Sequence, residues 1–318
     1  MNAPSAKPAF GDDVLPFQID GLGVRGRLVR LGDAAAEIAA ATRYPDAVAE
    51  LLASTLALCA ALAGGLKYEG VFTLQAQGNG PVRLLLADIT SDGELRGYAQ
   101  FDRDALDAAA DTGGGVVPRL LGAGHLAFTV DQGPDTDRYQ GITELTGATL
   151  ADCAQTYFRD SEQLETAIVL DAAPDATGAM RAAAFLIQRM PGSKGQVEGF
   201  DDPLEPWREA AVLASTVKSS ELLDPELSAT ALLYRLFHER GVRVFGAKPL
   251  RHACRCSRQR VAATLASFPR EEVIAMRDDG VISVTCEFCG TDYVFDDDAL
   301  ETLFADAAGD VSRRDNMP

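Results

Sequence analysis

Four cysteines near the C-terminus are the residues whose types and spacing most clearly specify chemistry. One residue separates Cys254 from Cys256, two separate Cys286 from Cys289, and 29 residues lie between the pairs. Two close pairs of thiolates, separated by a short domain's length of sequence, can converge on one tetrahedral point, which is typical of a closed structural zinc site. We therefore predict that these four cysteines bind one Zn²⁺ per chain.

The same spacing also permits redox chemistry. Successive Cα atoms lie about 3.8 Å apart, so Cys254 and Cys256 fall inside or at the edge of the roughly 4.4–6.8 Å separation that a disulfide tolerates. Such a bond would be strained, and strained disulfides are readily reduced. The site could bind metal when reduced and form two local disulfides when oxidised.

Four arginines surround the first cysteine pair in sequence: Arg251, Arg255, Arg258 and Arg260. Their charges could offset a tetrathiolate centre and favour thiolate over thiol. They could equally form the solvated face of a helix that follows the site. The sequence leaves both interpretations open.

The other candidate residues are not expected to react or to bind metal. Cys59 and Cys153 lie in helical segments and are expected to be small buried hydrophobic residues. His252 is the histidine nearest the metal segment, but with four cysteines available we do not expect it to be a ligand. The sequence has no Gly-x-Ser-x-Gly, Walker or dinucleotide-binding fingerprint, so we do not expect an enzyme.

Composition narrows the class of protein. The chain has 318 residues and 47% apolar content, enough for a full core, and its net charge of −18 weighs against nucleic-acid binding. Its apolar stretch at 51–66 is shorter than the roughly 18–20 residues that span a bilayer, so we expect no membrane association. The N-terminus lacks the pattern of a secretory signal. We therefore expect a cytoplasmic protein, with thiols kept reduced.

The first 190 residues predict an α+β fold, an antiparallel sheet domain with packed helices. Period-two alternation and turn residues indicate strands at 24–31, 71–77, 81–90, 94–101, 125–130, 139–145, 166–172 and 179–190. A nearly all-apolar segment at 45–63 predicts a core helix, and another helix is expected at 150–159. The three strands from 71 to 101 should form a meander.

Residues 191–248 are expected to form a helical linker. Helical patterns at 203–221 and 225–239 each begin with a proline. Their apolar residues need a neighbouring surface, which we expect the main domain to provide.

The segment 249–305 predicts a small zinc-binding domain, followed by a disordered tail at 306–318. Two helices and a strand are expected between the cysteine pairs, and Gly290 suits the turn after Cys289. A unit this small needs a staple, and structural zinc supplies about 10–16 kcal/mol to such peptides. Metal binding and folding should be one event.

Short motifs along nearly the whole chain give the sequence a family resemblance. They are Cys-x-Cys-Ser at 254–257, CEFC-G-x-x-Tyr-x-Phe at 286–295, VRGRLV at 24–29, LK-x-x-G at 66–70, LRGYA at 95–99, YQGI at 139–142, YFRDSEQ at 157–163 and LIQRMPG at 186–192. In this order, and with this cysteine spacing, they resemble the heat shock protein 33 family, also called the 33 kDa chaperonin.

The resemblance implies a redox-regulated holdase chaperone of the stress response. Such a protein is inactive when reduced and zinc-bound; on oxidation it forms a disulfide within each cysteine pair, releases zinc and binds unfolding proteins. The family's redox-active zinc ligands fall on Cys254, Cys256, Cys286 and Cys289. It further implies unfolding client proteins as partners and a homodimer in the active oxidised form. The sequence departs from the expected aromatic approach to the first pair, where Leu250-Arg-His-Ala stands.

Two other functions remain open from the residues alone. A zinc-ribbon interaction or nucleic-acid module is disfavoured by the acidic balance, because the segment from Pro249 onward carries eight basic and thirteen acidic residues. A thiol-disulfide oxidoreductase could use Cys286-x-x-Cys289, but it would need a thioredoxin-like βαβ context, which this region lacks.

Overall fold

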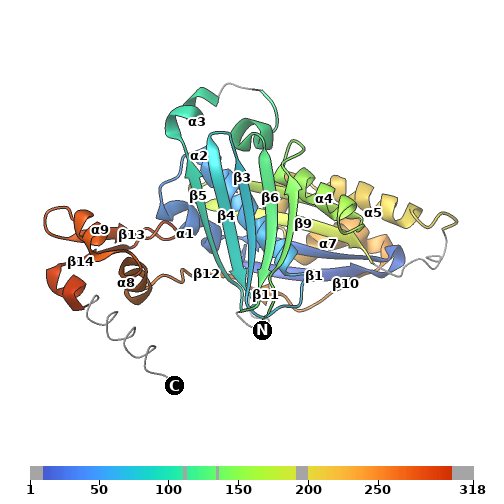
Figure 1. Ribbon diagram of the computed structural model, residues 1–318. Coiled ribbons are helices and arrows are strands. Elements are labelled where there is room, and N and C mark those ends of the chain that lie inside the picture. The colour runs from blue at the N-terminus through green and yellow to red at the C-terminus, as the bar shows by residue number, and fades with distance from the viewer. Residues whose placement is uncertain (1–9, 110–112, 134–135, 191–199, 303–318) are drawn as a thin grey trace, which may run out of the picture. The chain divides into compact units, whose positions relative to one another are not determined.

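The structure, a computed structural model, describes residues 10–109, 113–133, 136–190 and 200–302 (Figure 1). The chain forms two compact units, residues 1–253 and 254–318, which divide between Ala253 and Cys254. The first unit is built from two sheets and a central helix. The described part of the second is a small module of helices and a hairpin.

The first sheet combines strands from both ends of the first unit. Its order is β10-β1-β2-β9-β8, and β11 also pairs with β1. These pairings are all antiparallel. The strands are β1 (Asp13–Ile19), β2 (Val24–Leu31), β8 (Thr166–Pro174), β9 (Met180–Arg189), β10 (Val242–Val244) and β11 (Lys248–Pro249).

The second sheet has the order β12-β5-β4-β3-β6-β7. Its strands are β3 (Val71–Gly78), β4 (Val82–Thr90), β5 (Glu94–Phe101), β6 (Gly124–Asp131), β7 (Tyr139–Glu144) and β12 (Arg251–His252). The antiparallel pairing of β3, β4 and β5 confirms the predicted meander. β12 alone pairs in parallel, with β5, among the pairs that the structure describes.

Helix α2 (Asp46–Ala63) forms the centre of the first unit. It lies behind β3 and β4 in Figure 1 and contacts strands of both sheets, so nearly every side chain from Val48 onward is buried. It follows Pro45 and ends at Gly64, as predicted. By length and composition α2 could cross a membrane, yet 78% of that window is buried, as in the core helix of a globular protein.

Strand β9 divides its side chains between two cores. Ala182, Ala184 and Leu186 face the core around α2, and Ala183, Phe185 and Ile187 face a second core. This alternation follows from the period of two in a strand. One sheet therefore separates two apolar layers.

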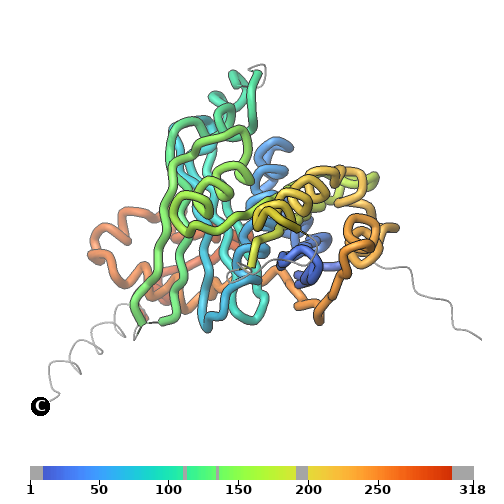
Figure 2. The backbone as a smooth tube through the Cα atoms, turned by 90° about the vertical axis from the view of Figure 1, so that its right-hand side faces the viewer, coloured from blue at the N-terminus to red at the C-terminus, as the bar shows by residue number. Residues whose placement is uncertain are grey.

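The linker helices cover the second core. They are α5 (Glu205–Ser215), α6 (Ser219–Leu222) and α7 (Ala229–Phe237), and α5 and α7 lie together in yellow and orange in Figure 2. The Phe185 ring stacks between Phe17, with centroids 5.6 Å apart, and Phe237, at 6.3 Å. These contacts confirm that the main domain covers the apolar linker face.

The bounds of the linker helices differ from the prediction. The helix expected at 203–221 ends at Ser215, because Lys218 is extended and starts α6 with Glu221 as its capping partner. The helix expected from Pro225 begins at Ala229, where the Ser228 hydroxyl accepts a hydrogen bond from the Ala231 amide. Local capping therefore outweighs the proline signal.

The remaining elements of the first unit are shorter. Helix α1 (Asp33–Ala41) begins where the Asp12 carboxylate accepts hydrogen bonds from the amides of Gly32 and Ala34. The others are α3 (Arg103–Ala109), α4 (Leu150–Asp160), the π-helix η2 (Val117–Leu121) and the 3₁₀ turns η1 (Asp20–Leu22) and η3 (His238–Arg240).

Helix α4 begins with a reciprocal cap that predicts a measurable stability effect. The Thr149 hydroxyl accepts from the Asp152 amide, and the Asp152 carboxylate accepts from the Thr149 amide. We expect Thr149→Ala to lower the free energy of unfolding by about 1 kcal/mol in chemical denaturation. The exposed Thr146→Ala is the control, and equal losses in both variants would contradict this role for the cap.

The second unit follows the predicted order of helix, helix and strand. It contains α8 (Arg258–Ala266), α9 (Arg270–Ala275), β13 (Ile282–Thr285) and β14 (Asp292–Phe295). Its buried apolar core within the described residues is small: Leu265, Val273, Ile282, Phe295 and Leu300. Such a core agrees with the need for a staple. The predicted disordered tail at 306–318 lies outside the described residues.

Candidate metal centre

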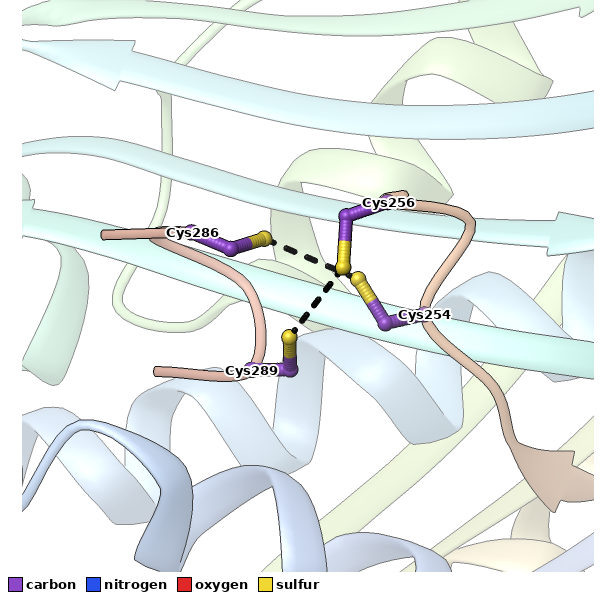
Figure 3. A group of neighbouring side chains, drawn as sticks. All are labelled: Cys254, Cys256, Cys286 and Cys289. Carbon is purple, nitrogen blue, oxygen red and sulfur yellow. Dashed lines mark hydrogen bonds between the residues drawn. The ribbon is translucent and has the colours of Figure 1, made fainter. Parts of the chain in front are cut away.

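The four cysteines of the second unit converge on one point (Figure 3). Their Sγ atoms all lie within 4.8 Å of one another. The Cys254 and Cys286 sulfurs are 3.7 Å apart, and the Cys256 and Cys289 sulfurs are 3.5 Å apart. A tetrahedral site with Zn–S bonds of about 2.3 Å has edges of about 3.8 Å. The donor set and its spacing therefore fit a closed zinc site.

Two chain segments bring these sulfurs together. Cys254 and Cys256 precede α8, which begins where the Ser257 hydroxyl accepts from the Arg260 amide. Cys286 and Cys289 lie in the turn between β13 and β14, which pair in register from Ile282–Phe295 to Thr285–Asp292. The hairpin places both sulfurs of the second pair in one turn.

The turn after Cys289 has the geometry that the sequence predicted for Gly290. This glycine has φ +68°, a left-handed conformation that favours glycine, and its amide donates to the Cys286 carbonyl at 2.8 Å. The Cys286 amide in turn donates to the Thr291 carbonyl at 2.9 Å. These bonds hold the Cys286–Cys289 loop closed.

Two neighbouring hydroxyl groups contact the sulfurs and were not singled out from the sequence. The Tyr293 hydroxyl donates to Cys256 Sγ at 3.0 Å, and the Thr291 hydroxyl lies 3.2 Å from Cys289 Sγ. Tyr293 appeared only within the CEFC-G-x-x-Tyr motif. Its register on β14, opposite Val284, is the structural information that assigns it to the site.

The metal-free thiols differ in acidity. Burial raises the pKa of Cys254 to about 12 and also raises the pKa of Cys286. Burial acts in the same direction on Cys289, but hydrogen bonds from Thr291 and neighbouring thiols outweigh it and lower its pKa to about 7. Because only thiolates bind zinc, a cation at this point must displace protons from the first two.

Two of the four arginines predicted near the site make other contacts in this structure. Arg251 pairs with Glu94 at 2.6 Å within the first unit. The Arg258 guanidinium lies over the Phe295 ring, 4.4 Å from its centroid, and donates to the Val294 carbonyl at 2.7 Å. Arg258 thus contributes to packing of the small core, which favours a structural role over charge compensation for this residue.

The remaining candidates from the sequence lie away from the four sulfurs. Cys59 and Cys153 are free and buried, as expected. His252 lies on β12, where Nδ1 is 3.1 Å from a Glu37 carboxylate oxygen, and it does not belong to the ligand cluster. Leu250, which begins the segment that departs from the expected aromatic pattern, is buried in the core around α2.

The hydrogen bond from the Tyr293 hydroxyl to the Cys256 sulfur leads us to expect lower zinc affinity when that hydroxyl is removed. Partners that hydrogen-bond metal ligands typically change affinity by 10–100-fold when removed. We expect Tyr293→Phe to weaken zinc binding about tenfold or more in competition with a chromogenic chelator. Val294→Ala, an exposed change on the same strand, is the control. Unchanged affinity in Tyr293→Phe would show that the hydrogen bond does not support the site.

Comparisons with known proteins match nearly the whole chain. The family model described as "Hsp33 protein" matches residues 12–296. The 33 kDa chaperonin of Caulobacter vibrioides is 45% identical over 293 residues, covering 90% of this chain and 95% of the relative. That of Ectopseudomonas mendocina is 38% identical over 297 residues, covering 93% and 96%.

A solved structure supports the fold. The crystal structure of the 33 kDa chaperonin (heat shock protein 33 homolog) from Thermotoga maritima aligns with a TM-score of 0.75 at 23% identity, covering 94% of this chain and 99% of that chain. At this identity the likeness concerns the fold alone. The family-model match and the two relatives, together with the motifs and the cysteine cluster, show that this chain belongs to the Hsp33 family.

Proposed function

We propose that this protein is a redox-regulated holdase chaperone, inactive when reduced and zinc-bound. The chaperone role is supported by the family and by the name of its relatives, which is not that of an enzyme class. The observation that carries the redox proposal is the cluster of four free thiols at tetrahedral spacing, in a module whose described residues include a core of only five buried side chains.

Cys254, Cys256, Cys286 and Cys289 are the proposed zinc ligands and redox switch. Bound zinc would cross-link the two segments that carry the pairs and keep their sulfurs as thiolates. Hydrogen peroxide oxidises each pair in turn: two thiolates give two electrons to one H₂O₂, which takes up two protons from solvent, so that one S–S bond and two waters form. Cys254 bonds to Cys256 and Cys286 to Cys289. The disulfide sulfurs are no longer thiolate ligands, so the module loses its staple.

The linker helices are the proposed source of client-binding surface. They cover apolar side chains on the first sheet, including Phe17, Phe185 and Ile187. The chain between α7 and Cys254 is held by β10, β11 and β12, strands of only two or three residues. When the module unfolds, these short strands would lose their pairing with β1 and β5. The linker helices would then detach from the first sheet. Each Å² of apolar surface exposed in this way would contribute about 25 cal/mol to binding when a client protein buries it.

The partners of the active form are unfolding proteins, which an apolar patch captures without sequence specificity. We further propose that the oxidised form is a homodimer and that the protein acts in the cytoplasm during stress. The domain limits are proposed as a chaperone core at 1–190, a linker at 191–248 and a redox-switch domain at 249–305. Neither nucleic acid nor membrane is a proposed partner.

The direct test measures zinc content and suppression of a model client's aggregation on the same samples, before and after peroxide. We expect one zinc per reduced chain, its loss on oxidation, and a coincident gain in holding activity. A reduced protein that is folded without metal would contradict the proposal. So would an oxidised, zinc-free protein that does not bind unfolding polypeptides.

A further inference from the structure

A cavity in the first unit collects side chains from motifs to which the proposed function assigns no role. It has a volume of about 460 Å³, within the range of about 300–1,000 Å³ of small-molecule sites. Five motifs that carry the family resemblance each contribute to its wall: Arg25 and Arg27 from VRGRLV, Lys67 from LK-x-x-G, Tyr139 from YQGI, Tyr157, Phe158 and Glu162 from YFRDSEQ, and Gln188 from LIQRMPG. The fold therefore brings segments far apart in sequence to one hollow.

The cavity contains a buried arginine with no carboxylate partner. Arg27 is 6% exposed, and its guanidinium donates to the Ala61 carbonyl at 3.2 Å and to Gln188 Oε1 at 3.1 Å, both neutral acceptors. Among the described residues, no carboxylate forms a hydrogen bond or ion pair with it. Burying a charge without an opposite charge is costly, so this arrangement is unusual for a purely structural arginine.

A second arginine increases the positive charge. Arg25 lies two residues earlier on β2 and lines the same cavity, and its buried Nε has no hydrogen-bond partner in the described part of the chain. Burial and the neighbouring charge of Arg25 lower the pKa of Arg27 to about 10, so Arg27 stays protonated at neutral pH. Two adjacent cations in a protein of net charge −18 favour an anion between or beside them.

Glu162, the acidic residue of the cavity lining, is hydrogen-bonded to two tyrosines. The hydroxyls of Tyr139 and Tyr157 both donate to Glu162 Oε1 at 2.6 Å. These bonds lower the pKa of Glu162, so it is ionised but directed at the tyrosines. Neither arginine forms an ion pair with Glu162 among the contacts of the described residues. With Lys67, the charged groups on the wall sum to a net positive charge.

Two glycines make room for the polar groups of this wall. A Cβ at Gly65 would collide with the Arg27 guanidinium, and a Cβ at Gly141 would collide with the Tyr157 hydroxyl. At both positions the backbone lies closer to these groups than a residue with a side chain would allow. The lining also includes the aromatic side chains of Phe72, Phe128 and Phe158.

We propose that this cavity binds a small monocarboxylate with an apolar body. The carboxylate accepts hydrogen bonds from Arg25 and Arg27, whose planar forks match its geometry. The apolar body lies against the three phenylalanines. This site lies within the first unit, and its occupancy does not depend on the cysteine chemistry proposed above.

Calorimetric titration of the reduced, zinc-loaded full chain tests the site, with octanoate below its micelle concentration as the probe. We expect one octanoate per chain. Binding of 1-octanol, which has the tail without the charge, and of acetate, which has the charge without the tail, should each be at least tenfold weaker. Arg25→Gln should weaken octanoate binding at least tenfold. Arg83→Gln, an exposed change on β4, should leave the affinity for octanoate unchanged.

The same titrations can overturn the proposal. Equal affinities for octanoate and 1-octanol would make the cavity a purely apolar site, and equal affinities for octanoate and acetate would make it a general anion site. An absence of octanoate binding, or an unchanged affinity in a folded Arg25→Gln variant, would also reject it. The comparison of the three probes on the unsubstituted protein remains decisive if Arg25→Gln does not fold. Failure here would leave zinc content and peroxide response unaffected, so the two proposals are tested separately.

Discussion

Replacing Cys286 and Cys289 by alanine will remove bound zinc and unfold the C-terminal module. Both sulfurs belong to the cluster within 4.8 Å, and the module has only five buried apolar residues in its described core. Structural zinc contributes about 10–16 kcal/mol to folding of small modules, far more than such a core supplies. Metal analysis should show loss of one zinc per chain, and limited proteolysis should cut within 258–300 while the first unit stays intact.

The matched control is Glu287→Ala, an exposed change between the two ligands. It should retain zinc and resist proteolysis like the unsubstituted protein. If the double cysteine variant keeps an ordered module and still responds to peroxide, the coupling between metal, module and activity is wrong.

Replacing Phe237 by alanine will loosen the linker without touching the metal site. Phe237 is fully buried at the end of α7 and stacks on Phe185 of β9. Truncation of a buried phenylalanine costs about 3–5 kcal/mol through lost contacts and the cavity left behind. We expect faster amide hydrogen exchange in α5–α7 and measurable holding activity in the reduced, zinc-loaded state.

Tyr234→Ala is the control for this variant, because Tyr234 lies on the same helix with 68% of its surface exposed. It should leave exchange and activity at the level of the unsubstituted protein. Faster exchange in Phe237→Ala without any gain in holding activity would show that the linker face is not the client-binding surface.

The cysteine cluster and most strands were predictable because their signals are local. Alternation in VFTLQAQ and PVRLLLADIT specifies two half-buried strands, and the glycines around Asn79 specify the turn between them. The cysteine pairs are equally local, because one residue separates Cys254 from Cys256 and two separate Cys286 from Cys289. The hairpin that carries Cys286 and Cys289 also agrees with a structural site rather than a thioredoxin-like βαβ unit.

Features set by long-range pairing could not be predicted in the same way. Strands β10, β11 and β12 are two or three residues long and exist because β1 and β5 offer free edges. Their own sequence has too few residues to show a period. Tyr293 likewise meets Cys256 only after β14 pairs with β13. The cavity around Arg27 depends on five distant segments, and no single one predicts it.

The division of β9 between two cores has a consequence for the proposed release of the linker. Ala182, Ala184 and Leu186 pack in the core around α2, on the side of the strand that the linker helices do not cover. If α5 and α7 detach, the first sheet would therefore keep its pairing. Phe185 and Ile187 would remain on its surface for the two helices to pack on again. Under the proposed function, return to the resting state then requires zinc to rebind, the C-terminal module to refold, and a short helical segment to pack again on an existing surface. Because the segment is helical and its contacts within each helix are local, its folding should be fast once the module has refolded.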